Sequence, residues 1–252
     1  MTTTGEPCWI QLSTSDVDTA ISFYGDLFGW SVGEASEEFG GYRMFLRGDQ
    51  PIAGLAPTPD GIASTWSVFL QTPDLPHTLE RAAASGGRVV VEPMQIADLG
   101  TMAEVVDPAG AAVGAWQADT FPGFVTRAED GAPAWFETLT TSYDDTVAFY
   151  RDAFGWDANV VSDTPEFRYT TLGLNENARA GVMDASGFLG QEPSRWQFYV
   201  QVADTDETVA RAVATGGEAL VAAEDTPYGR IATLEDPAGI RFCVLGPSLD
   251  AS

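Results

Sequence analysis

The chain repeats itself, and this constrains its fold more than any other feature of the sequence. Residues 7–30 (PCWIQLSTSDVDTAISFYGDLFGW) return as residues 133–156 (PAWFETLTTSYDDTVAFYRDAFGW), with identical residues at ten of the 24 positions. Later landmarks recur in the same order: Trp66 as Trp196, the glycine pair 86–87 as 216–217, and the DPAG segment 107–110 as 236–239. Such a repeat indicates two homologous domains, so every candidate site exists in two versions that can be compared.

The repeats predict domains at residues 1–118 and 133–252, joined by a linker at 119–132 that holds Pro and Gly and has no regular hydrophobic period. No apolar run reaches the roughly 18 residues that a membrane-spanning helix needs. The N-terminus lacks the basic start and apolar stretch of a secretory signal. We therefore expect a cytoplasmic protein with no membrane partner.

The charge and the cysteines exclude further classes. A net charge of −25 would repel phosphate groups, which argues against a nucleic-acid partner. The same charge would suit a cationic small molecule. Cys8 and Cys243 both lie in apolar, strand-like segments, and two cysteines are too few for a disulfide scaffold, so we expect buried free thiols.

Hydrophobic spacing predicts a strand, a helix and three strands, and then the same series again, in each repeat. The first helix is capped by Asp16 and runs to about Phe28. Its copy has Ser142 at the cap position and an aspartate three residues later, which is a capping-box pattern. Gly29 and Gly155 are expected to end these two helices. Asp74 and Asp204 are expected to cap two further helices, each of which ends at a glycine pair.

This order of motifs resembles the vicinal-oxygen-chelate superfamily of glyoxalases, bleomycin-resistance proteins and extradiol dioxygenases. The resemblance rests on a strand, then D-x6-F-Y-x3-F-G-W, a second helix ending in Gly-Gly, and D-P-x-G before the last strand. It covers almost the whole chain and is closest to a two-repeat actinobacterial branch described as glyoxalase-like or as hydroxylases. It implies an α+β fold of tandem glyoxalase-like domains, in which four βαβββ modules form two curled-sheet cups.

The resemblance also implies a divalent metal ion, but none of the first- and last-strand ligand positions holds a usual ligand except Cys243, and a lone thiol does not make a site. The superfamily takes His, Gln or Glu ligands from the first, fifth and last strands of a domain. The corresponding positions here are Trp9, Ser67 and Gly114 in the first repeat, and Trp135, Gln197 and Cys243 in the second. The only histidine, His77, is expected to be solvated or to cap a helix. We therefore predict no metal and no cofactor, although an all-carboxylate Mg²⁺ or Mn²⁺ site stays open.

Strand alternation indicates which residues face each cup. Aromatic shelves with a few amide and hydroxyl groups suit a small molecule with flat rings. The predicted ligand-binding residues are Trp9, Gln11, Phe69, Gln71 and Trp116 in the first repeat, and Trp135, Tyr169, Gln197, Tyr199, Gln201, Tyr228 and Arg241 in the second.

The second repeat has Glu137 where the first has Gln11. A carboxylate beside tyrosines in an apolar cup could act as a general base, which makes Glu137 the one catalytic candidate. The alternative is that Glu137 forms a structural ion pair with an arginine.

Three functions follow from these residues. The first is metal-independent binding or sequestration of an aromatic or drug-like metabolite by a monomer or homodimer. The second is a metal-free enzyme of secondary metabolism, such as a lyase, isomerase or hydroxylase, with Glu137 or a tyrosine as acid or base. The third is a non-catalytic interaction protein whose cups are filled by Trp9 and Trp135. Open cups with no aligned acid or base would favour the first function. One open cup that holds a buried Glu137 with Tyr or Arg neighbours would favour the second, and two cups plugged by Trp9 and Trp135 would favour the third.

Overall fold

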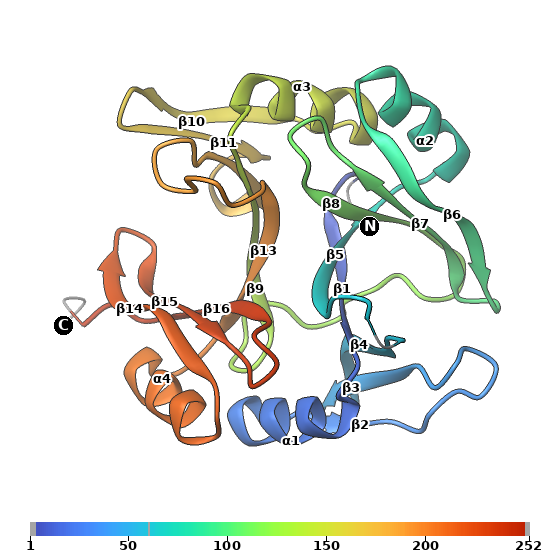
Figure 1. Ribbon diagram of the computed structural model, residues 1–252. Helices are drawn as coiled ribbons and strands as arrows, with labels where there is room; N and C mark the ends of the chain where they lie inside the picture. The colour runs from blue at the N-terminus through green and yellow to red at the C-terminus, as the bar shows by residue number, and fades with distance from the viewer. Residues whose placement is uncertain (1–3, 60, 250–252) are drawn as a thin grey trace. The chain divides into compact units, whose positions relative to one another are not determined.

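The computed structural model describes residues 4–59 and 61–249 (Figure 1). The elements of the first repeat are β1 (Pro7–Thr14), α1 (Val17–Phe28), β2 (Ser31–Val32), β3 (Arg43–Arg47), β4 (Gln50–Pro57), β5 (Thr65–Gln71), α2 (Leu75–Ala84), β6 (Arg88–Ile96), β7 (Gly100–Val106) and β8 (Ala112–Ala118). Those of the second are β9 (Pro133–Thr140), α3 (Tyr143–Phe154), β10 (Ala158–Thr164), β11 (Phe167–Leu172), β12 (Ala180–Asp184), β13 (Arg195–Gln201), α4 (Thr205–Ala214), β14 (Glu218–Thr226), β15 (Gly229–Glu235) and β16 (Arg241–Gly246). The second repeat adds a short 3₁₀ helix, Asn175–Asn177.

Each repeat forms one eight-stranded sheet. The strand orders are β2-β3-β4-β1-β5-β8-β7-β6 and β10-β11-β12-β9-β13-β16-β15-β14, so the second sheet repeats the topology of the first. β1 pairs with β4 and β5 with β8 in parallel, whereas the outer pairs β3–β4 and β7–β8 are antiparallel. The predicted α+β class and the four βαβββ modules are confirmed.

The helices α1 to α4 each begin directly after the predicted cap residue, which is Asp16, Asp74, Ser142 or Asp204. Asp16, Asp74 and Asp204 each accept a hydrogen bond from a backbone amide of the first helical turn. Gly29 and the equivalent Gly155 end α1 and α3 in the left-handed conformation, with φ values of 70° and 67°.

The capping box predicted at Ser142 is wrong, because the Ser142 side chain makes no capping hydrogen bond. Asp144 and Asp145 lie in the first turn of α3 instead, where their negative charge interacts favourably with the helix dipole.

The chain divides into two compact units, and neither unit is one half of the sequence. Unit 1 combines the residues up to Trp9 with Ser67–Gly123 and Phe136–Trp196, and unit 2 combines Ile10–Trp66, Phe124–Trp135 and the residues from Gln197 onwards. In Figure 1, α2 lies beside α3 within unit 1, and α1 lies beside α4 within unit 2. Each unit thus contains one βαβββ module from each repeat. The predicted domains at 1–118 and 133–252 remain a division based on the sequence repeat.

The motifs shared by the repeats meet inside these units. In unit 2, the Tyr24 hydroxyl donates to the Asp236 carboxylate (3.0 Å) and accepts from Trp66 Nε1 (2.9 Å). Burial and the nearby Asp236 charge raise the pKa of Tyr24 well above its usual value. Phe23 packs against Gly217, where a Cβ would lie 3.1 Å from the ring. The FY motif of the first repeat therefore contacts the glycine pair and the DPAG turn of the second.

Unit 1 contains the reciprocal arrangement. The Tyr150 hydroxyl donates to Asp107 (3.2 Å) and accepts from Trp196 Nε1 (2.7 Å). A Cβ on Gly87 would lie 2.6 Å from the Phe149 ring, so only glycine fits there. Burial raises the pKa of Asp107, although hydrogen bonds from Tyr150 and from backbone amides oppose the shift. These recurring Tyr–Asp and Phe–Gly contacts stabilise the fold. A ligand site must therefore be sought among other residues.

Candidate functional site

The second repeat holds one buried carboxylate on the predicted binding face. Glu137 on β9 is 6% exposed, and its Oε2 accepts a 2.7 Å hydrogen bond from the Tyr169 hydroxyl of β11. The Tyr169 ring stacks on Phe167, with 5.5 Å between centroids and 11° between planes. All three residues lie in unit 1. A hydroxyl donor at this distance forms a charge-assisted hydrogen bond with an ionised carboxylate.

A glycine makes this hydrogen bond possible. Gly181 on β12 lies beside Glu137 in the parallel β9–β12 register. A Cβ on Gly181 would collide with the hydroxyl end of Tyr169, so any other residue would displace the phenol from the carboxylate. We call Glu137, Tyr169 and Phe167, with Gly181 beneath them, the Glu137 site.

The first repeat has a different pair at the equivalent position. Gln11 lies beside Gly54, as Glu137 lies beside Gly181, and Met44 pairs with Gly54 as Thr171 pairs with Gly181. Tyr42 precedes Met44 by two residues, as Tyr169 precedes Thr171, so Tyr42 is the counterpart of Tyr169.

Gln11 is only partly buried, and its Nε2 donates to Ser13 Oγ at 3.3 Å. The first repeat therefore offers an amide where the second offers a carboxylate.

Unit 2 holds the remaining predicted residues of the second repeat. Gln197 Nε2 donates to the Tyr199 hydroxyl at 2.8 Å, and the partly buried Gln201 contacts the Val202 carbonyl at 3.5 Å. Arg241 forms an ion pair with Glu235 at 3.2 Å. Tyr228, also predicted to bind a ligand, lies in the turn between β14 and β15 and is 68% exposed.

Two aromatic residues of the first repeat, Trp9 and Trp116, are contacted by a phenylalanine of the linker. Phe121 packs edge-on against Trp9, with 4.9 Å between ring centroids, and against Trp116 at 6.3 Å. Trp116 Nε1 donates to the Phe121 carbonyl at 2.9 Å. Trp9 and Trp116 are 6% and 8% exposed, whereas Trp135, the counterpart of Trp9, is less buried.

Sequence reasoning missed three of these residues. Phe121 lies in a segment without helix or strand, where no periodicity assigns a side chain to a face. Tyr42 stands just outside β3, and its position emerges only from the sheet register. The role of Gly181 depends on the reach of Tyr169, which the sequence does not specify.

The metal positions implied by the resemblance do not fit a metal ion. Gly114 pairs with Phe69 in the β5–β8 register, and the Phe69 ring fills the space that a side chain on Gly114 would enter. The equivalent Cys243 is 2% exposed, and its sulfur lies 3.6 Å from Thr233 Oγ1. Across residues 4–59 and 61–249, no group of three or more His, Cys, Asp or Glu side chains is placed to hold a metal ion. At the two last-strand positions, the described side chains therefore supply no oxygen or nitrogen donor for such an ion.

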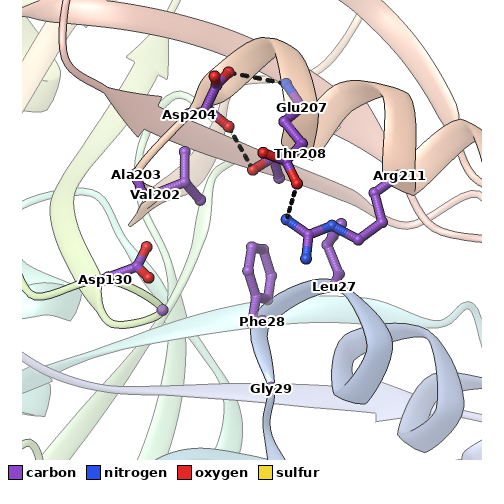
Figure 2. A pocket seen from close by; sticks show the side chains of 11 residues that line it. Leu27, Phe28, Gly29, Asp130, Val202, Ala203, Asp204, Glu207, Thr208 and Arg211 are labelled. Carbon is purple, nitrogen blue, oxygen red and sulfur yellow. Dashed lines mark hydrogen bonds and ion pairs between the residues drawn. The ribbon is translucent and has the colours of Figure 1, made fainter.

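An open pocket of about 240 Å³ lies elsewhere in unit 2 (Figure 2). It is bounded by the end of α1, by Asp130 and Gly131 of the linker, and by the start of α4. Its polar groups already serve the helix: Asp204 caps the Glu207 amide at 2.9 Å, and Arg211 lies 3.9 Å from the Glu207 carboxylate. The pocket is lined by other residues than those predicted to bind a ligand.

The remaining candidates have structural roles. His77 is exposed at the start of α2, where its amide is capped by Asp74, as expected of a solvated residue. Cys8 and Cys243 are buried free thiols, which confirms that expectation. In the part of the chain that the structure describes, no helix is both long and apolar enough to cross a membrane.

Comparisons with known proteins agree with this architecture. Residues 8–114 match the Glyoxalase/Bleomycin resistance protein/Dioxygenase superfamily, and residues 136–245 match a Glyoxalase-like domain. Over 97% of this chain and 95% of the relative, the sequence is 33% identical to CFP32 of Mycobacterium tuberculosis, whose name describes a glyoxylase. DnrV of Streptomyces peucetius, an anthracycline biosynthesis protein, is 31% identical over 96% of this chain and 93% of its own length.

A solved structure shares the fold at much lower identity. The Mn(II)-bound glyoxalase from Novosphingobium aromaticivorans superposes with a TM-score of 0.65 and 15% identity, covering 100% of this chain and 86% of the glyoxalase chain. At this identity the likeness concerns the fold alone.

Proposed function

Because the chain belongs to the Glyoxalase/Bleomycin resistance protein/Dioxygenase superfamily, we propose that it uses the superfamily fold to bind a small aromatic metabolite at the Glu137 site without a metal ion. The observation that carries the proposal is the buried Glu137 carboxylate, held by the Tyr169 hydroxyl at 2.7 Å. Burying a charged group is unfavourable unless it is hydrogen-bonded, and a carboxylate kept at such a cost commonly serves a function.

The neighbouring rings support an aromatic ligand. The stacked Phe167 and Tyr169 form an apolar wall beside one charged acceptor. Such a wall favours flat rings, and a single well-placed polar group fixes their orientation. DnrV is named for anthracycline biosynthesis, and anthracyclines are polycyclic aromatic compounds. The net charge of −25 would further attract a ligand that carries an amine.

The side chains at the first- and last-strand ligand positions support the proposed independence from metal. Trp9 and Gly114 in the first repeat, and Trp135 and Cys243 in the second, occupy positions where the superfamily places its ligands, and Phe69 fills the space above Gly114. Glu137 therefore recognises the ligand directly as an acceptor in this proposal.

The same geometry favours one alternative, a metal-free enzyme of secondary metabolism. The Glu137 carboxylate could accept a proton from a bound substrate, and the hydrogen-bonded Tyr169 would hold the carboxylate in position. Positioning a substrate against this pair would supply much of the rate enhancement. The two functions differ in the fate of the ligand: a binding protein releases it unchanged, whereas an enzyme converts it to a product.

Binding to chelator-treated protein tests the proposal. A panel of aromatic metabolites that includes anthracyclines is titrated while tryptophan fluorescence is followed, first without and then with added Mn²⁺ or Zn²⁺. We expect saturable binding that Glu137→Gln weakens at least tenfold, which corresponds to about 1.4 kcal/mol. Glu224→Gln, the same change at an exposed carboxylate of β14, is the matched control and leaves affinity unchanged. Binding that requires added metal, or that survives Glu137→Gln, contradicts the proposal.

Mass spectrometry of the bound ligand separates the two functions. An unchanged ligand after long incubation supports binding alone. A product that wild type forms and Glu137→Gln does not form, although the variant still binds, supports the enzyme.

A further inference from the structure

The linker places a phenyl ring against two tryptophans in the first repeat. Phe121 meets Trp9 edge-on at 4.9 Å and 89°, and meets Trp116 at 6.3 Å and 74°. These distances and angles are those of favourable edge-to-face aromatic pairs. The two tryptophans therefore already hold one aromatic ring, which the chain itself supplies.

A polar group beside these rings has no partner. Gln71 pairs with Trp116 in the parallel β5–β8 register, so the two side chains lie on the same face of the sheet. Gln71 Oε1 is buried, and among the described residues no donor lies within hydrogen-bonding distance of it. A buried carbonyl without a donor costs about 1–3 kcal/mol, and most native structures avoid it. Phe121 cannot satisfy Gln71, because a phenyl ring carries no donor.

We propose that Trp9, Trp116 and Gln71 form a second ligand site, which accepts a single aromatic ring bearing a hydrogen-bond donor, such as a phenol, when Phe121 moves out. Phe121 stands in for that ring in the closed state. The ligand would keep the aromatic contacts of Phe121 and add the hydrogen bond to Gln71 that Phe121 cannot make. This site goes beyond the proposed function and does not depend on Glu137.

The attachment of the linker is consistent with such an exchange. Residues 119–132 contain neither helix nor strand. The Asp119 and Phe121 amides donate to the Leu99 carbonyl at 2.9 and 3.1 Å, and these bonds join the segment to the turn before β7. Gly123 has a φ of 96° and passes so close to the Cys8 carbonyl that a Cβ would collide with it. The Thr120 hydroxyl also donates to the Asp98 carbonyl at 2.7 Å, and Trp116 Nε1 donates to the Phe121 carbonyl at 2.9 Å. The backbone of the segment is thus held on both sides of Phe121, and the exchange requires the Phe121 side chain to rotate away from the two tryptophans.

Closure by Phe121 lowers the apparent affinity of the site. A ligand that binds only the open state has its affinity reduced by the fraction of molecules that are open. Removing the Phe121 ring should therefore strengthen binding, which is the opposite of what a mutation in an ordinary contact residue does.

Phenol and toluene are the probes, because they share a ring and differ in the donor. Their affinities are measured by isothermal titration calorimetry, and their effects on the melting temperature are compared for wild type and Phe121→Ala. We expect Phe121→Ala to bind phenol at least tenfold more tightly than wild type, and phenol at least fivefold more tightly than toluene. In Phe121→Ala/Gln71→Leu the preference for phenol should disappear. Phe121→Leu, which keeps more of the buried volume, should show an intermediate gain and serves if the alanine variant does not fold.

Three results would overturn the second site. Equal binding of phenol and toluene to Phe121→Ala would reveal only an apolar void. Equal phenol affinity of wild type, Phe121→Leu and Phe121→Ala would show that Phe121 does not close a site. Loss of phenol binding in Phe121→Ala/Glu137→Gln would place the phenol at the Glu137 site. Because the Glu137 site is tested in wild type with Phe121 in place, either proposal can fail while the other stands.

Discussion

The two repeats agree in the residues that hold the fold and differ in the residues that are predicted to bind a ligand. Tyr24 and Tyr150 make the same hydrogen bonds to an aspartate and a tryptophan. Glu137, by contrast, faces Tyr169 where the first repeat has Gln11. The linker also covers Trp9 and Trp116 of the first repeat, and the counterpart of Trp116 is the aliphatic Leu245. In this internal repeat, the contacts that recur are structural, and the positions that differ are candidates for function.

The shared scaffold gives the largest predicted effects, and these should be equal in the two repeats. Phe23 and Phe149 are 2% and 1% exposed, and each packs against a glycine of the other repeat. Truncation to alanine should lower the free energy of unfolding by about 3–5 kcal/mol in each case. Chemical denaturation measures both values. A difference larger than about 1 kcal/mol between Phe23→Ala and Phe149→Ala would break the proposed equivalence.

Removing the tyrosine hydroxyl at equivalent positions should destabilise the second repeat more than the first. Tyr169→Phe removes a donor from the buried Glu137 carboxylate and should lower the free energy of unfolding by about 1–3 kcal/mol. Tyr42→Phe changes a partly buried residue at the equivalent sheet position, in a repeat that has Gln11 in place of Glu137, and should cost less than about 1 kcal/mol. Urea unfolding of the two variants side by side checks this. Equal losses in the free energy of unfolding would mean that the Tyr169 hydrogen bond to Glu137 does not stabilise the second repeat in particular.

Gly114 and Cys243 offer a third comparison, because they stand where the superfamily places a metal ligand on the last strand. A methyl group on Gly114 would collide with the Phe69 ring, and such overpacking should destabilise Gly114→Ala by about 1–3 kcal/mol. Cys243→Ala at the equivalent position removes one buried sulfur atom and should cost about 1 kcal/mol. Melting temperatures of both variants test this difference. A neutral Gly114→Ala would show that Phe69 moves aside easily, and the argument against a ligand side chain there would weaken.

The smallest effect concerns pH and again should match between the repeats. Burial raises the pKa of both Asp107 and Asp236 in the folded protein. A carboxyl group whose folded-state pKa is raised stabilises the protein most at low pH, and that contribution falls as pH rises through the raised pKa. The stability of wild type relative to Asp107→Asn should therefore decrease from acidic pH upward and become constant near neutrality. Denaturation at a series of pH values would contradict this if the difference grew with pH, and Asp236→Asn should give the same curve.

The sequence predicted the scaffold well because its signals are local. The cap residues of α1 to α4 and the glycine stops after α1 and α3 are predictable from residues a few positions apart, and only the side-chain hydrogen bond expected at Ser142 does not form. Long-range pairing was not accessible. Nothing local indicates that Tyr24 bonds to Asp236, 212 residues away. The ligand face was predicted only as a set of strand positions, and the side chains that complete it, Phe121 and Tyr42, lie outside regular strands.

The crossed hydrogen bonds of Tyr24 with Asp236 and of Tyr150 with Asp107 affect how such a protein can evolve. The two halves of the gene resemble independent copies, yet each copy completes the fold of the other. A half exchanged by recombination must bring a helix and a DPAG turn that still fit a partner with a separate mutational history. The two repeats must therefore evolve together at these contacts, and only residues that make no contact with the other repeat are free to diverge.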